Sequence, residues 1–303
     1  MTHSGILLVD KPEGPTSSQV VQRIKTHLRA KKVGHLGTLD PFASGLLLVG
    51  VNEGTKVAEI FLAATKSYHG VMVLGVETDT QDATGKVTEA HRVPAVGQRE
   101  LKAIKEKFTG NLQQIPPMFS ALKKNGVPLY RLARQGKEIE RKPRPISIEG
   151  LRLKKLSDSE IEFDVTCSRG TYVRTLAADI GKYIGCGAHL KMLNRTACGH
   201  LTLDDAATPD AIERLIAEEQ VPLLSLAAAL SHLRPIVWDA GRVSRLRLGQ
   251  QEGLADIGER VKDEKVVRLL DGRGALVALV AWGEESTGGG RWRLWRVFHP
   301  ESA

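Results

Sequence analysis

The sequence is poor in the residues that build disulfide-bonded and zinc-bound proteins. Three of its 303 residues are cysteine, and aromatic residues make up 5% of the chain. Cys167, Cys186 and Cys198 are odd in number and too widely spaced for a CxxC element. A disulfide framework and a zinc site are therefore disfavoured. We expect reduced thiols in the protein core and no bound metal ion.

Signatures of several enzyme and membrane-protein classes are also missing. The sequence has no HExxH pair, no GxxxxGK[ST] phosphate loop and no GxSxG elbow. No apolar run approaches the roughly eighteen residues that cross a bilayer. The first residues, MTHSGILLVDKPEG, lack the basic region and long apolar core of a signal peptide. These absences disfavour metal hydrolases, nucleoside triphosphatases and serine hydrolases, and they predict a cytoplasmic protein.

Positive charge is what the chain has in excess. It contains 43 Lys and Arg against 35 Asp and Glu, a net charge of +8 and a pI near 9.4, which favours a polyanionic partner such as nucleic acid. Between Lys123 and Arg144, eight basic residues stand against two acidic ones, among several prolines. This basic insertion, placed around residues 112–146, is either solvated surface or a flexible loop that closes over a phosphate backbone.

One carboxylate stands in an unusually glycine-rich stretch, GHLGTLDPFASGLLLV (residues 34–49). Asp40 precedes a proline, which is typical of the start of a helix or turn capped by the Asp side chain. Gly34 and Gly37, however, permit backbone angles and close approaches that other residues resist. His35 adds a polar ring that no cap requires. The stretch is therefore either a helix cap or a loop that holds Asp40 in place for chemistry.

Interleaved strand and helix patterns predict an α+β domain. Apolar runs predict strands at residues 5–9, 45–51, 67–76 and 160–167. Helices are expected from Thr16 or Ser17 to Gly34, and over residues 57–64, 98–108 and 169–185, while residues 77–86 have the composition of a surface turn. Several strand pairs have links too short for a helical crossover. This predicts a mixed, largely antiparallel sheet with flanking helices.

The character of the sequence changes near residue 235. Two apolar strands joined by a Gly-rich turn are followed by RWRLWRVF, in which arginines alternate with Trp292, Leu294 and Trp295. We therefore expect residues 1–234 to form one domain and residues 235–303 a small all-β domain. The alternation fits a solvated face opposite a core face, and it equally fits exposed aromatics beside arginines that contact RNA.

Motifs along nearly the whole chain resemble those of the TruB family of pseudouridine synthases. In chain order they are LLVDKPEGPTSSQVV, GHLGTLDPFASGLLLV, TKSYHGVMVLGVETDTQDATG, PPMFSALKKNGVPLYRLARQGKEIERKPR, SRGTYVRTLAADIG and LNRTACGHLTLDDA. The resemblance implies a pseudouridine-synthase fold followed by a PUA-like RNA-binding domain. The long basic insertion resembles that of the stand-alone bacterial tRNA enzymes more than that of the guide-RNA-dependent relatives.

The resemblance also implies a reaction. The family isomerises the T-loop uridine at tRNA position 55 after flipping the base. Asp40 would be the nucleophile or base, and Arg174 the arginine that pairs with it. Tyr68 would be the tyrosine that stacks on the flipped base and helps to remove the C5 proton. The routes through the sugar C1′, the base C6 or the sugar C2′ all stay open. Because the reaction is an isomerisation, no cofactor is expected.

Further residues would bind the RNA by the same resemblance. These are His35, Lys11, Tyr172, Lys123, Arg134, Arg141, Lys142 and Arg144. The expected partner is tRNA, bound by its T-arm and acceptor end to a monomeric protein. A non-catalytic RNA chaperone and a guide-RNA-dependent rRNA synthase remain as alternatives. The set of Asp40, Tyr68 and Arg174 disfavours the first, and the long insertion disfavours the second.

Overall fold

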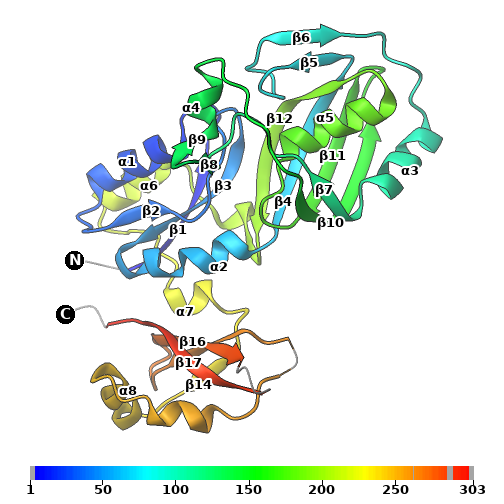
Figure 1. Cartoon of the computed structure of the whole chain (residues 1–303). Helices are drawn as coiled ribbons and strands as arrows, with labels where there is room; N and C mark the ends of the chain where they lie inside the picture. The colour runs from blue at the N-terminus through cyan, green and yellow to red at the C-terminus, as the bar shows by residue number, and fades with distance from the viewer. Residues whose placement is uncertain (1–3, 262, 285–288, 300–303) are drawn as a thin grey trace.

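The computed structural model describes residues 4–261, 263–284 and 289–299, and its larger part is built on one mixed sheet (Figure 1). The strand order is β1-β3-β12-β4-β11-β10-β7, with β2 added beside β3 and β13 beside β12. Strand β12 pairs in parallel with β3, and the other neighbours pair antiparallel. The predicted mixed, largely antiparallel sheet is confirmed. Its strands are β1 (Gly5–Lys11), β2 (Val33–His35), β3 (Ser44–Val51), β4 (Lys66–Leu74), β7 (Gly110–Gln114), β10 (Arg144–Lys155), β11 (Glu160–Cys167), β12 (Ala188–Cys198) and β13 (Leu201–Thr202).

Alternation of apolar residues decides how the strands face the core. In β11, Ile161, Phe163 and Val165 are each at most 2% exposed, as their spacing predicts. The three cysteines are buried and free, which confirms the expectation of core thiols. Within the described residues, no helix is long and apolar enough to cross a membrane.

Helices pack against this sheet at both ends. They are α1 (Ser17–His27), η1 (Asn52–Val57), α2 (Ala58–Ala63), α3 (Gln98–Lys107), α5 (Val173–Ile184), η2 (Leu203–Asp205), α6 (Pro209–Ala217) and α7 (Leu226–Ala229). Thr16 caps α1 through a capping box with Gln19. Gly185, with φ of 89°, ends α5 as predicted.

The prediction that α1 runs to Gly34 is wrong. The helix ends at His27, and the next residue, Leu28, already has extended backbone angles. Gly34 instead lies in β2, opposite Gly50 of β3. A Cβ atom at Gly34 would meet no atom within 4 Å, so no close approach explains this glycine.

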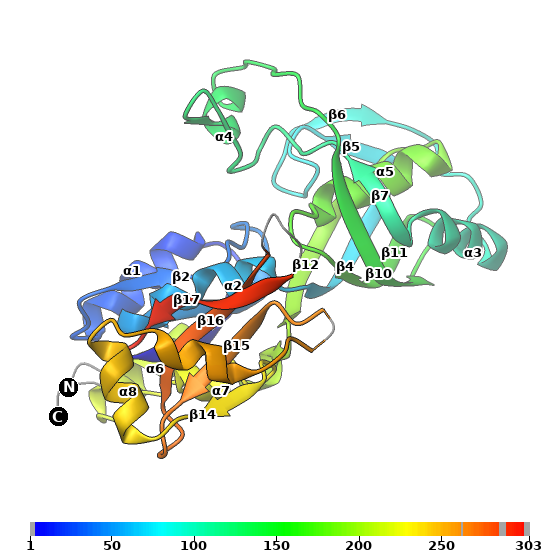
Figure 2. The ribbon, with the colours of Figure 1, turned by 60° about the horizontal axis from the view of Figure 1, so that its bottom comes forward.

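The basic insertion leaves the sheet between β7 and β10. It contains two short strands, β8 (Lys123–Lys124) and β9 (Val127–Pro128), and the helix α4 (Leu129–Ala133). Figure 2 shows the green segment with α4 standing out from the sheet. A second excursion, the hairpin of β5 (Val76–Thr78) and β6 (Val87–Ala90), lies near α5 (Figure 1).

The C-terminal part carries a second sheet with the order β14-β15-β16-β17. Its elements are β14 (Pro235–Val237), α8 (Ala240–Arg247), η3 (Glu252–Ile257), β15 (Val266–Leu270), β16 (Leu276–Glu284) and β17 (Gly290–Val297). The sheet was predicted, but the all-β description is wrong because α8 and η3 cover one face. Trp238 and Trp292 are at most 6% exposed beneath them, so these aromatics form core and are closed to RNA.

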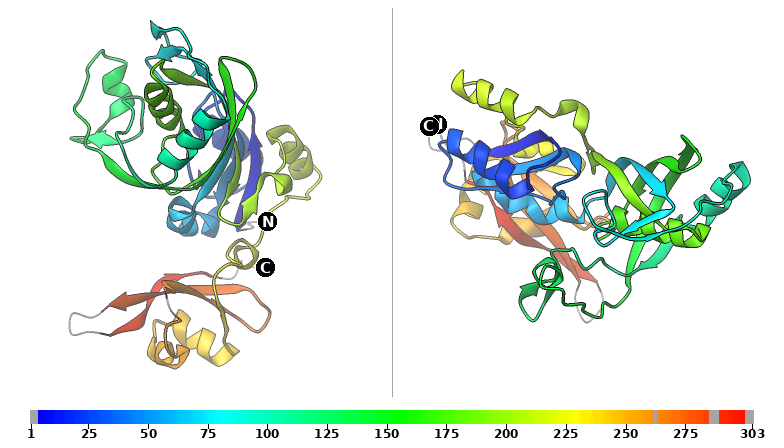
Figure 3. Two further views of the ribbon diagram at one scale, coloured as in Figure 1. Left: turned by 90° about the vertical axis from the view of Figure 1, so that its right-hand side faces the viewer. Right: turned by 90° about the horizontal axis from the view of Figure 1, so that it is seen from above.

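The opposite face of this second sheet packs against the larger part of the chain (Figure 3). Leu279 of β16 and Phe298, which follows β17, share one apolar cluster with Ile6 and Phe61. Each of these four side chains is at most 2% exposed. Lys56 donates to the Val297 carbonyl at 2.9 Å across the same contact. The two sheets therefore meet through a continuous apolar interface.

Candidate active site

The turn that carries Asp40 is fixed by backbone hydrogen bonds from several sides. The buried Ser17 hydroxyl accepts from the Leu39 amide at 2.8 Å and donates to the Leu39 carbonyl at 2.9 Å. The Gly14 amide donates to the Pro41 carbonyl at 2.8 Å, and the Ala43 amide to the Asp40 carbonyl at 3.1 Å. Asp40 thus begins a turn, one of the two structures expected at an Asp-Pro pair, and a strand rather than a helix follows it.

Lys11 lies beneath this turn and does not reach solvent. Its ammonium donates to the carbonyls of Pro12 at 2.7 Å and Pro41 at 3.3 Å, and the residue is 0% exposed. Burial lowers the pKa of Lys11 to about 8, while the Asp40 and Glu13 carboxylates oppose the shift. In this structure the Lys11 donors are directed at the turn, and its expected contact with RNA stays a prediction.

Arg195 of β12 holds the other side of the turn. Its guanidinium donates to the carbonyls of Leu46 at 2.7 Å, Thr38 at 3.3 Å and Gly37 at 3.4 Å, and the residue is 3% exposed. Gly45 lets the backbone of Arg195 approach the strand that follows the turn. Its φ is +98°, and a Cβ atom there would lie 2.5 Å from the Arg195 carbonyl oxygen.

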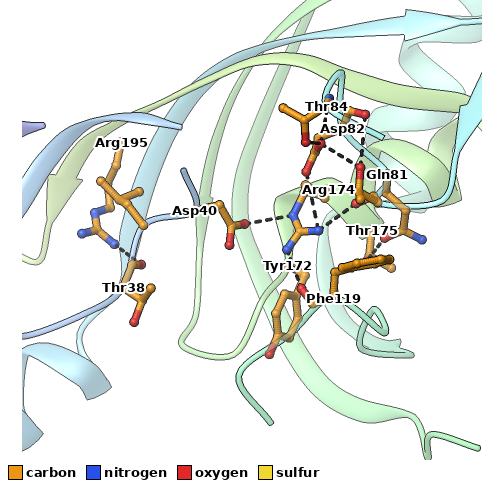
Figure 4. A network of polar contacts seen from close by, with 12 residues as sticks. Thr38, Asp40, Gln81, Asp82, Thr84, Phe119, Tyr172, Arg174, Thr175 and Arg195 are labelled. Carbon is orange, nitrogen blue, oxygen red and sulfur yellow. Dashed lines mark hydrogen bonds and ion pairs between the residues drawn. The ribbon is translucent and has the colours of Figure 1, made fainter. Parts of the chain in front are cut away.

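Arg174, in the first turn of α5, reaches Asp40 directly (Figure 4). Its Nε atom lies 2.9 Å from Asp40 Oδ2. The Arg174 side chain is 5% exposed, whereas 41% of the Asp40 side-chain surface is open. Asp40 Oδ1 accepts from no side chain or amide in the described part of the chain. A buried arginine thus orients an accessible carboxylate.

The remaining donors of Arg174 connect Asp40 to two distant loops. Nη1 donates to the Thr80 carbonyl at 2.7 Å and Nη2 to the Phe119 carbonyl at 2.9 Å. Nη1 also lies 3.7 Å from Oδ2 of Asp82. Figure 4 shows these groups converging on one guanidinium. Full use of the planar fork explains why arginine rather than lysine stands here.

Asp82 is a buried member of this network that the sequence did not reveal. Residues 77–86 were expected to be a surface turn, but Asp82 is 4% exposed, which contradicts this for the middle of the segment. Its Oδ1 accepts from the Thr80 hydroxyl at 2.8 Å and from the Thr84 amide at 3.0 Å and hydroxyl at 2.6 Å. Asp82 thereby shapes the loop that presents the Thr80 carbonyl to Arg174.

Tyr68 and His35 are linked to this site by Arg195, whose charge acts on both side chains. Tyr68 on β4 pairs in register with Arg195 on β12. Burial raises the pKa of Tyr68 to about 12, and the Arg195 charge opposes the shift. Burial also lowers the pKa of His35, with Arg195 acting in the same direction. Both side chains are therefore neutral near pH 7, and His35 Nδ1 is buried without a partner among the described residues.

Tyr172 is positioned at the entrance of α5 by Gln114. The Tyr172 amide donates to Gln114 Oε1 at 2.8 Å, and Gln114 Nε2 donates to the Tyr172 carbonyl at 3.1 Å. Gln114 is 3% exposed at the end of β7, and no motif pointed to it. Burial raises the pKa of the Tyr172 phenol, on which the Asp40 charge acts in the same direction. Tyr172 thus lies in the electrostatic reach of Asp40.

The expected RNA-binding cations of the basic insertion differ in their surroundings. Lys123, Lys142 and Arg144 are exposed. Arg134 is also exposed and lies 5.7 Å from the centre of the Tyr130 ring. Arg141 is half-buried and bonded to backbone carbonyls. The structure therefore separates solvent-facing cations from one that is engaged within the insertion.

One group of side chains in the described ranges could hold a metal ion, and it belongs to a different part of the fold. Glu77, Glu89 and His91 lie together at the β5–β6 hairpin. His91 Nε2 and Glu89 Oε2 are hydrogen-bonded at 2.9 Å, and both residues are exposed. Their proximity is explained by this bond and by the pairing of Glu77 with Glu89 across the hairpin.

Comparison with known proteins identifies the family. A model of the TruB family pseudouridylate synthase N-terminal domain matches residues 25–173, and one of the tRNA pseudouridylate synthase B C-terminal domain matches residues 174–237. A relative from Geotalea uraniireducens, tRNA pseudouridine synthase B, is 44% identical over 286 residues that cover 92% of each chain. The chain belongs to the TruB family. Pseudouridylate synthases are isomerases, so this chain is assigned to the isomerases.

Further comparisons agree with the TruB assignment. A protein of the same description from Geobacter sulfurreducens is 42% identical over 302 residues, which cover 97% of this chain and 99% of the relative. Among solved structures, a chain of a Cbf5-Nop10-Gar1 complex is similar with a TM-score of 0.74 at 24% identity, covering 98% of this chain and 85% of that chain. A chain of an H/ACA RNP bound to a substrate RNA containing 2′-deoxyuridine gives a TM-score of 0.74 at 23% identity, with the same shares covered. These likenesses confirm the pseudouridine-synthase fold.

Proposed function

We propose that this chain isomerises the T-loop uridine at tRNA position 55 to pseudouridine, with Asp40 as the reacting carboxylate. The observation that carries the proposal is the pair of an accessible Asp40 and a buried Arg174, joined at 2.9 Å. An oriented carboxylate with one uncommitted oxygen is a competent nucleophile or base. The names of the relatives from Geotalea and Geobacter supply the tRNA substrate.

The isomerisation needs no external reactant. The N1–C1′ bond of the uridine breaks, the base turns, and a C5–C1′ bond forms. C5 then loses its proton and N1 gains one. Asp40 acts at C1′, at C6 or at C2′, and each route requires the carboxylate to face the flipped nucleotide. Flipping costs a few kcal/mol, which phosphate contacts and stacking offset.

Tyr68 contributes as a neutral phenol. Because burial raises its pKa to about 12, the phenolate is scarce at physiological pH. A neutral phenol is a weak base, so stacking on the flipped base suits Tyr68 better than removal of the C5 proton. The substrate contacts of His35 and Tyr172, and those of the exposed cations in the basic insertion, belong to the same proposal.

Purified protein and an unmodified tRNA transcript, tritiated at C5 of its uridines, test this function. Release of tritium without any added partner is expected, and it should stop when uridine 55 is replaced by cytidine. Binding without release would support a non-catalytic RNA chaperone. Release that begins only after a guide RNA and partner proteins are supplied would support a guide-dependent rRNA synthase.

A further inference from the structure

Arg141 lies at the neck of the basic insertion, where the segment that leaves the sheet at Pro116 meets the segment that returns at Ile139. Its Nη1 atom donates to the Pro116 carbonyl on the outgoing chain at 3.3 Å, and Nε donates to the Ile139 carbonyl on the returning chain at 3.1 Å. Nη2 lies 3.3 Å from the Glu138 carboxylate. With 22% of its side chain exposed, Arg141 joins the two chains and directs few donors to solvent.

A short path leads from this neck to Asp40. Phe119 follows Pro116 by three residues, and its carbonyl accepts from Arg174 Nη2 at 2.9 Å. The next residue, Ser120, is 4% exposed and accepts at its carbonyl from the Tyr130 amide at 3.1 Å, at the start of α4. The segment of Phe119 and Ser120 is thus held between α4 and Arg174, and Arg141 closes the neck beside it.

Opening of the neck would disturb the contact between Asp40 and Arg174. Arg174 is buried, so loss of the Phe119 carbonyl would leave Nη2 without a partner away from water. The guanidinium would then reorient, and the Nε bond to Asp40 depends on the same rigid plane. The position of the insertion and the orientation of Asp40 are therefore coupled through one side chain.

We propose that Arg141 is a positioning residue for the Asp40–Arg174 pair, and that it acts by holding the neck closed so that Phe119 meets Arg174. The proposal rests on the proposed function for its kinetic consequence. It replaces the expectation that Arg141 contacts phosphate. The ion pair with Glu138 contributes little, because the Glu138 side chain is 83% exposed. The carbonyl bonds at Pro116 and Ile139 carry the role.

The first experiment compares Arg141→Gln with two neighbouring variants, Glu138→Gln and Lys142→Gln. We expect the single-turnover rate on saturating tRNA to fall about tenfold in Arg141→Gln, the loss that follows when one charge-assisted bond no longer favours the closed neck. The dissociation constant for tRNA and its salt slope should change little. Glu138→Gln should keep the wild-type rate, and Lys142→Gln, which removes an expected phosphate contact, should raise the dissociation constant for tRNA.

Hydrogen exchange provides a readout that does not depend on activity. In the free protein, Arg141→Gln should speed exchange of the amides between residues 117 and 130, while exchange in the central strands stays unchanged. Arg141→Lys keeps the charge but loses the planar fork, so we expect an intermediate rate and an unaltered salt slope. Its folding is monitored by the same central-strand exchange.

Two results would overturn the proposal. One is a wild-type rate in Arg141→Gln together with weaker binding and a reduced salt slope, which places Arg141 among the phosphate contacts. The other is a lower rate with unchanged exchange over residues 117–130, which removes the neck from the explanation. If the wild-type protein releases no tritium, the proposed function fails, yet the exchange experiment still tests the role of Arg141.

Discussion

Around Asp40 the positive side chains are buried and donate to backbone carbonyls, whereas most of those in the basic insertion point into solvent. Lys11, Arg174 and Arg195 are each at most 4% exposed and hold the turn from three directions. Lys123 and Lys142 are exposed, as expected for groups that would meet phosphate. Burial therefore separates the positive side chains that hold the Asp40 turn from those that would meet phosphate. Removing a buried cation should disturb chemistry or stability, and removing an exposed one should disturb affinity.

The largest effect is expected at the carboxylate that the buried cations surround. Asp40→Asn preserves shape and removes the charge, so turnover should fall by at least about three orders of magnitude, at ~1.36 kcal/mol of barrier per tenfold. Affinity for tRNA should stay within a few-fold, because phosphate contacts elsewhere supply it. Tritium release and filter binding measure the two quantities. Asp158→Asn, at a fully exposed carboxylate, is the control. Appreciable turnover in Asp40→Asn would exclude Asp40 as the reacting group.

Arg174→Lys should produce the next largest effect. An ammonium cannot bond Asp40, Thr80 and Phe119 in one plane, and a bond to a charged group contributes about 1.5–3 kcal/mol, so kcat should fall about a hundredfold or more. The change in affinity should be smaller. Steady-state kinetics and a binding titration separate the two. Unchanged kcat with badly weakened binding would instead make Arg174 an RNA contact.

Lys11 extends the comparison to stability. Its pKa is about 8 in the folded protein and near 10.5 when exposed, so below pH 8 the fold holds an unfavourable buried charge. As pH rises from about 8 to 10.5, the folded state loses this proton first, and stability rises. Over this pH range, the free energy of unfolding of the wild type should therefore increase by about 2–3 kcal/mol relative to that of Lys11→Met. Urea unfolding at pH 7, 9 and 10 measures the difference. A constant difference would mean that Lys11 is not desolvated.

The smallest effect is expected in the insertion. Neutralising Lys123, Lys124 and Lys142 to Gln should weaken tRNA binding and reduce the slope of log K against log salt by roughly 0.7–0.9 for each phosphate that these lysines no longer neutralise. The rate on bound tRNA should stay near the wild-type value. Lys102, Lys105 and Lys107 on α3 provide a control with the same change in net charge. Equal salt slopes in both triple variants would show that Lys123, Lys124 and Lys142 are only solvated.

Local pattern predicted much of the fold, because each strand and helix carries its own periodicity. The alternation in β11 and the glycine that ends α5 are properties of short segments. The end of α1 was missed because the basic residues after His27 continue a helix-compatible pattern, while pairing of β2 with β3 draws the chain into a strand. Such pairing is a long-range competitor that no local signal shows.

The site residues likewise divide into those that local motifs predicted and those that depend on long-range contacts. Asp40, Arg174 and Tyr68 came from motifs, and the Asp40–Arg174 contact agrees with that prediction. Asp82, Gln114 and the buried role of Arg195 were missed, since each depends on residues that are distant in sequence. Lys11 was assigned to RNA by the resemblance of its motif to the family. Its burial follows from the fold of the turn above it, which sequence alone does not locate.

The apolar contact between the two sheets should couple their unfolding. Leu279 and Phe298 are buried in the same cluster as Ile6 and Phe61, so neither sheet completes its core alone. A chain that stops at residue 234 would uncover the partners of both side chains, including a face of β1, the edge strand of the large sheet. Heating should then melt both sheets in one cooperative transition. We therefore expect the unit of folding to extend across residue 234, where the architecture changes.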